Sequence, residues 1–141
     1  MEAGKISPII LAIAESEKET TAEIRVALSQ RRFDSDPLKR VKKIFYQNGM
    51  QNTKNRNAIL LYINLKKHKF AIFGDEGIHH IVKQNYWDEI VKELSQDLKY
   101  THYENAIAIA VRKLGSILKT LFPVSLDNPN PDELSNEVLR D

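Results

Sequence analysis

The feature that most constrains the fold of this chain is an unbroken apolar run, residues 58–63 (AILLYI). A strand with one buried face alternates apolar and polar side chains. A run that is apolar at every position instead indicates a strand that is covered on both faces, as at the centre of a helix-covered sheet. We therefore predict a central strand over residues 57–65 with helices packed against both of its faces.

The segments around this run supply the rest of a layered fold. Ser7 followed by Pro8, and Asp36 followed by Pro37, are typical helix starts, because each pairs a side-chain acceptor with a proline in the first turn. The expected elements are a helix over 7–20, a strand over 23–29, a helix from 36 to a stop at Gly49, strands over 57–65 and 69–73, and two helices with apolar stripes over 87–98 and 106–121. This order predicts the α/β class, as a three-layer α/β/α sandwich with a small mixed central sheet.

The length of 141 residues predicts one domain, which we place at 1–126, followed by a polar C-terminal tail at 127–141. Pro129 and Pro131 lie in this tail, and we expect it either to wrap the surface or to fray.

Composition narrows the classes of function and partner. The net charge of +2, from 21 basic and 19 acidic residues, is too balanced for nucleic-acid binding, and the absence of cysteine excludes disulfides, thiolate zinc sites and a cysteine nucleophile. No segment reaches the roughly 20 apolar residues that a membrane span needs. The apolar stretch 6–14 contains Pro8 and runs into several glutamates, so it favours a first helix over a signal segment. We expect a cytoplasmic protein.

Two adjacent carboxylates, Asp75 and Glu76, stand between Gly74 and Gly77 directly after the strand 69–73. Neighbouring acids repel each other unless they are solvated or share a cation. The turn therefore indicates a site for a divalent metal or for phosphate chemistry, and the alternative is a hydrated strand-to-helix turn.

Several segments, taken in order, resemble the TPM domain, a family named for thylakoid-lumen, photosystem II and nematode founder proteins. They are residues 23–26, Met50 and Thr53 ahead of 56–62, then 74–78, Trp87, Phe122-Pro123, and 130–138, which resembles the ending of short bacterial members. The resemblance covers nearly the whole chain. It implies a stand-alone α/β/α domain, an acidic groove that can hold a divalent metal, and the acid-phosphatase activity reported for some plant relatives. Many relatives have Asp-Asn-Gly where this chain has Arg56-Asn57-Ala58, so a base replaces one family acid.

A parallel pairing of 23–29 with 57–65, followed by an antiparallel hairpin, brings Glu23, the loop 49–57 and the turn 74–77 to one end of the sheet. The predicted metal ligands are the carboxylates of Asp75, Glu76 and Glu23, with Thr53 and Asn57 helping to complete a shell of about six to eight oxygens. Such hard oxygen donors favour Ca²⁺, with Mg²⁺ or Mn²⁺ as competitors. Glu23 has the alternative of pairing with an arginine.

Two functions follow from this ligand set. The favoured hypothesis is a divalent-metal-binding module, in which calcium orders the loop 49–57 and the turn 74–77 and regulates contact with a protein partner. The alternative is a metal-dependent acid phosphatase acting on phosphomonoesters, with Lys54 or Arg56 holding the substrate oxygens. A purely structural adaptor is a third possibility. We favour metal binding because the sequence offers no evident nucleophile or base.

Overall fold

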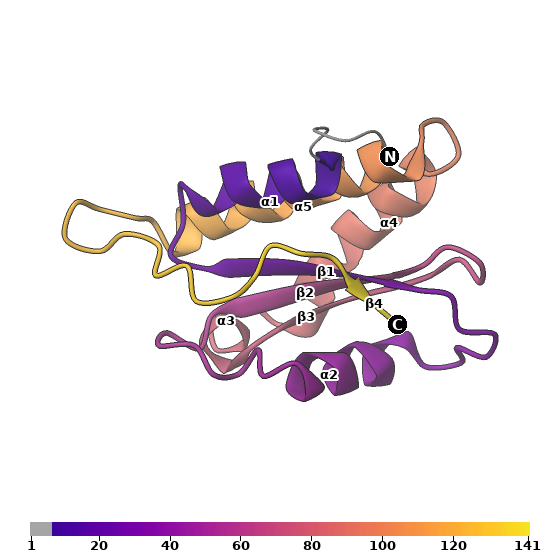
Figure 1. Cartoon of the computed structure of the whole chain (residues 1–141), viewed down its shortest axis with the longest axis horizontal. Helices are drawn as coiled ribbons and strands as arrows, with labels where there is room; N and C mark the ends of the chain where they lie inside the picture. Colours follow the sequence, from indigo (N-terminus) through magenta and orange to yellow (C-terminus); the bar gives the residue numbers. More distant parts are fainter. Residues whose placement is uncertain (1–6) are drawn as a thin grey trace.

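The fold is a mixed sheet between two helical layers (Figure 1). The computed structural model describes residues 7–141, so the first six residues of the expected domain 1–126 lie outside it. The four strands are β1 (Glu23–Ser29), β2 (Ala58–Asn64), β3 (Lys69–Gly74) and β4 (Leu139–Arg140), in the order β3-β2-β1-β4. β1 is parallel to β2 and β4, whereas β3 is antiparallel to β2. This arrangement confirms the α/β class and the mixed sheet.

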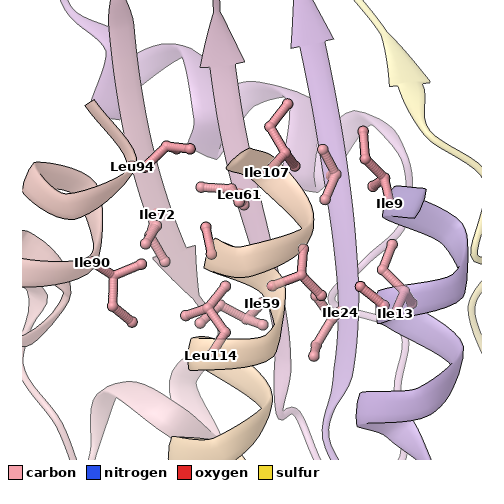
Figure 2. Packing of buried hydrophobic residues seen from close by; sticks show 14 of the residues in the cluster. Ile9, Ile13, Ile24, Ile59, Leu61, Ile72, Ile90, Leu94, Ile107 and Leu114 are labelled. Atoms are coloured by element: carbon pink, nitrogen blue, oxygen red, sulfur yellow. The ribbon is translucent and has the colours of Figure 1, made fainter. Parts of the chain in front are cut away.

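The predicted double burial of the central strand is what joins the layers. Every residue of β2 is buried. On one face, alternate side chains of β1, β2 and β3 pack against α1 (Pro8–Glu17), α4 (Asp88–Asp97) and α5 (Tyr103–Leu121), as Figure 2 shows. On the other face, Leu60 and Tyr62 pack with α2 (Pro37–Gln47) and Met50. Because both faces of β2 exclude water, its apolar run stabilises two cores at once.

The helices α1 and α2 begin at the capping residues that the sequence predicts. The Ser7 side chain accepts a hydrogen bond from the amide of Ile9, and Asp36 accepts one from the amide of Lys39, each just before a proline in the first turn. Gly49 follows the end of α2 with a φ of +66°, a left-handed conformation that glycine adopts without strain. The first helix ends at Glu17, earlier than expected.

Three short elements were not given bounds by the sequence, although a helix after the turn at Asp75 was one of its two alternatives. They are the helical turn α3 (Glu76–His79), the 3₁₀ helix η1 (Gln84–Trp87) and β4. Each is too short to carry a periodic apolar pattern. No helix among residues 7–141 has the length and apolar character of a membrane span.

The tail 127–141 wraps the molecule along the outer edge of β1, the first of our two alternatives. Near its start, the Asn130 side chain donates to the carbonyls of Thr20 (2.7 Å) and Ala22 (2.8 Å). At its end, β4 pairs with β1, and the Asp141 carboxylate pairs with Arg40. The tail therefore supplies the edge strand of the sheet.

Candidate functional site

The sheet brings all the segments of the predicted site to one end. Glu23 lies opposite Ala58 in the β1–β2 register, and the amide of Asp75 donates to the carbonyl of Ala58 at 2.9 Å. The side chains, however, divide into two separate groups. One surrounds Asp75 at the turn after β3, and the other surrounds Glu23 at the edge of β1.

At the turn, Asp75 is paired with a cation of the protein itself. Its carboxylate is 1% exposed and accepts hydrogen bonds from Nε (2.7 Å) and Nη2 (2.8 Å) of Arg56 and from the amide of Glu76 (2.8 Å). Nη1 of Arg56 lies 3.3 Å from the Glu76 carboxylate. The hydrogen bond to Asp75 raises the pKa of Arg56 above its usual value. Because the guanidinium already lies between these two acids, the turn does not fit a metal ion.

The loop before β2 is held directly against this turn. The Gly77 amide donates to the Arg56 carbonyl at 2.8 Å, and a Cβ at Gly77 would lie 2.6 Å from that oxygen and 2.7 Å from the Asn55 carbonyl. Arg56 itself has a φ of +49°. The loop and the turn thus meet by backbone contact, which only glycine permits at position 77.

Among the described residues, no hydrogen bond joins the side chain of Thr53 or Asn57 to the carboxylates of the turn. Asn57 donates to the Thr21 hydroxyl at 3.2 Å. The Thr53 hydroxyl is buried and has no hydrogen-bond partner among the described residues.

The Glu23 side chain belongs instead to an acidic cluster, which we define as Glu17, Glu23 and Asp132. One carboxylate oxygen of each lies within 4.8 Å of the others. Glu17 is the last residue of α1, Glu23 is the first of β1, and Asp132 comes from the C-terminal tail with a φ of +49°. The cluster therefore joins three segments that are far apart in the sequence.

One member of this cluster, Glu23, has a buried carboxylate oxygen without a partner among the described residues. Glu23 is 0% exposed; its Oε1 accepts a hydrogen bond from the Leu134 amide at 2.7 Å, while its Oε2 has no partner within residues 7–141. Glu17 is 6% exposed and accepts one from the Ile24 amide at 2.9 Å. A buried carboxylate oxygen without a donor is costly, so this position calls for a proton or a cation.

The electrostatics of the cluster agree with that requirement. Burial raises the pKa of Glu17 to about 8; the Ile24 amide opposes the shift, and the charges of Glu23 and Asp132 add to it. Burial also raises the pKa of Glu23, against the effect of the backbone amides of Leu134 and Glu133, and the charges of Glu133 and Asp132 add to the shift. A hollow of about 280 Å³ opens beside the cluster, lined by Ala14, Glu17, Lys18, Asn130, Asp132 and Asn136. Its carboxylate and amide oxygens are donors that fit Ca²⁺ and the smaller hard cations.

Glu17 and Asp132 were missed by sequence reasoning. Glu17 had one local signal, because it is an acid at the end of a helix shortly before a strand that begins with another acid. Asp132 had no such signal, since its position depends on the path of the tail back along β1.

Known proteins of similar sequence and structure share this architecture. A family model described as the TPM domain matches residues 3–117. The BA42 protein from the psychrophilic bacterium Bizionia argentinensis has 30% sequence identity to this chain. Its NMR structure matches with a TM-score of 0.82, and the match covers 94% of this chain and 90% of BA42. A search of curated proteins gives no match.

Two further NMR structures share the fold at lower identity. The N-terminal domain of a P. gingivalis protein is 17% identical with a TM-score of 0.66, over 86% of this chain and 81% of that one. The N-terminal domain of the cg2496 protein from Corynebacterium glutamicum has 13% sequence identity and a TM-score of 0.61, and the match covers 100% of this chain and 81% of that domain.

Proposed function

The chain belongs to the TPM domain family, and from that premise we propose that it is a divalent-cation-binding module whose cation is held by Glu17, Glu23 and Asp132. The observation that carries this proposal is the Glu23 side chain, which belongs to a three-carboxylate cluster and whose Oε2 atom is buried and unpartnered among the described residues. A cation at this position would satisfy that oxygen and neutralise the repulsion among the three acids.

Calcium is the expected ion, with Mg²⁺ and Mn²⁺ as competitors. The donors are all hard oxygens, and the chain has no cysteine. Three carboxylates supply part of a calcium shell of about six to eight ligands, and backbone carbonyls and water would supply the rest. Mg²⁺ demands a stricter octahedral geometry, which three side chains from three separate segments are less suited to give.

A shared proton is the competing account of the same cluster. With its pKa at about 8, Glu17 keeps a proton at neutral pH and so removes one negative charge from the site. A cation must displace this proton, so a cluster that exists only to share it would show no binding of calcium near neutral pH.

Replacing Glu23 with Gln is expected to weaken calcium binding at least about tenfold, or roughly 1.4 kcal/mol. Gln keeps an oxygen that can accept from the Leu134 amide, so the fold is retained while the charge is lost. The measurement is calorimetric titration with CaCl₂, with amide NMR spectra to verify the fold.

The matched control is Glu76→Gln, which removes the exposed acid of the turn 74–77 and should leave calcium affinity unchanged. If Glu76→Gln weakens binding and Glu23→Gln does not, the cation sits at the turn and the acidic cluster is not its site. If wild-type protein shows no calcium binding, the proton-sharing account replaces the proposal.

The phosphatase alternative has weaker support. The cations that we expected to hold substrate oxygens are Lys54 and Arg56, and the Arg56 guanidinium is engaged by Asp75 and Glu76. A phosphate would have to compete with both carboxylates for it. Binding of a cation without turnover is therefore the function that the described contacts support best.

A further inference from the structure

We propose that the bound cation clasps the C-terminal strap, residues 130–141, onto the edge of β1, so that the cation controls whether this edge is covered. The inference rests on the proposed function, because it uses the same acidic cluster. It adds that one ligand, Asp132, belongs to a segment that can leave the domain while the other two stay in place.

The strap meets the cluster through more than one contact. Asp132 contributes a carboxylate oxygen, and the Leu134 amide donates to Oε1 of Glu23. Between them, the Glu133 carboxylate accepts from the Lys54 amide at 3.0 and 3.2 Å. Undocking the strap would therefore remove a ligand from the cluster and also remove the hydrogen bond from the Leu134 amide to Glu23.

Apolar contacts hold the strap only weakly. Its apolar side chains are Leu134, Val138 and Leu139, and all three are only partly buried against the cores. The connection from α5 passes through an exposed turn, where Ser125 and Asn128 exchange backbone hydrogen bonds and Leu126 is fully exposed. Figure 1 shows this connection extending away from the body before the strap returns along β1. With so little buried apolar area, the strap is held mainly by polar contacts, among them the Asn130 hydrogen bonds and the pairing of Asp141 with Arg40.

Charge decides when the strap opens. Without a cation, docking brings Asp132 and Glu133 towards the buried carboxylate of Glu23, and these like charges oppose docking. With a cation in the cluster, the Asp132 carboxylate becomes a ligand and the same approach is favourable. Because the docked state offers the cation one more carboxylate than the open state, the cation shifts the population towards the docked state.

Docking covers backbone groups of the sheet edge. The Asn130 amide satisfies the carbonyls of Thr20 and Ala22, and the Asp141 amide donates to the carbonyl of Leu28 at 2.9 Å. An open strap would leave these acceptors on an unpaired strand edge, which is a surface that pairs with other extended segments. The cation thus regulates the exposure of β1.

The test is hydrogen exchange of the full chain, with and without calcium, read at the amides of Leu134 and Asp141. At a calcium concentration that calorimetry shows to be saturating, we expect protection of both amides to rise at least about tenfold over the metal-free protein. In Asp132→Asn, saturated in the same way, this gain should be lost. The matched variant Asp127→Asn, in the exposed connection, should keep it.

The outcomes separate the two proposals. Calcium binding with unchanged protection of Leu134 and Asp141 overturns the clasp and leaves the proposed function standing. A gain that persists in Asp132→Asn also overturns the clasp, because the cation would then act without contacting the strap. An absence of calcium binding in calorimetry overturns both.

Discussion

Replacing Glu17 with Gln is expected to remove most of the pH dependence of stability that the metal-free protein shows between pH 4.5 and about 8. Glu17 is nearly fully buried beside Glu23, and burial raises its pKa from 4.5 to about 8. Gln resembles the protonated carboxyl, and its side-chain oxygen can still accept from the Ile24 amide. The substitution therefore removes the titration and keeps the hydrogen bond.

The direction of the effect follows from proton binding. Below pH 4.5 the Glu17 carboxyl is protonated in both the folded and the unfolded chain. As the pH rises, the unfolded chain loses this proton first, while the folded chain keeps it until about pH 8. The free energy of unfolding of the wild type therefore falls through this window, by at most about 1.4 kcal/mol per pH unit, or roughly 4 kcal/mol in all.

Urea unfolding at a series of pH values, in the presence of a chelator, measures this slope. Glu17→Gln should be about as stable as the wild type near pH 4.5 and clearly more stable near pH 8. The control is Glu15→Gln, on the exposed side of the same helix, which should leave the wild-type slope in place. Equal slopes for Glu17→Gln and the wild type would show that this carboxyl does not hold a proton in the folded chain.

Replacing Gly77 with Ala is expected to destabilise the fold by about 2–3 kcal/mol. The added Cβ would lie 2.6 Å from the Arg56 carbonyl oxygen and 2.7 Å from that of Asn55. Both are backbone atoms, so no side-chain rotation relieves the clash. Separating the loop from the turn would also weaken the hydrogen bond from the Gly77 amide and disturb the pairing of Arg56 with the buried Asp75.

Denaturant unfolding measures this cost, and Glu76→Ala is the neighbouring control. Glu76 is exposed and its pairing with Arg56 is a surface contact, so its loss should cost well under the effect of Gly77→Ala. Calcium affinity adds a second readout, since a cation held at the acidic cluster should bind folded Gly77→Ala as tightly as the wild type. A stable Gly77→Ala protein with wild-type unfolding would contradict the close contact of loop and turn.

The pairing of Arg56 with Asp75 also explains a departure from the family pattern. The resemblance to the family implied an acid at the position of Arg56, and the Arg56 guanidinium lies between Asp75 and Glu76. A third acid at this position would need a bound cation to balance the charge, whereas Arg56 supplies that charge itself. We therefore propose the acidic cluster at the edge of β1, and not this turn, as the cation site of this chain.

The sequence by itself determined the layers of the protein. The apolar run 58–63 required cover on both faces, and the structure buries all of β2. Ser7-Pro8 and Asp36-Pro37 began helices where they were expected to. These features depend on the spacing of apolar side chains and on the capping of free amides. Both involve near neighbours along the chain, so a short window of residues is enough to predict them.

Only the tertiary structure decided which acids meet. Asp75 and Glu23 reach the same end of the sheet, yet one pairs with Arg56 and the other joins Glu17 and Asp132. That choice depends on the direction of each side chain, on the return of the tail along β1, and on which carboxylate oxygen is left buried without a donor. The strength of the interactions between these charges depends on their separation in space and on how deeply they are buried. Neither the separation nor the burial can be read from distance along the chain.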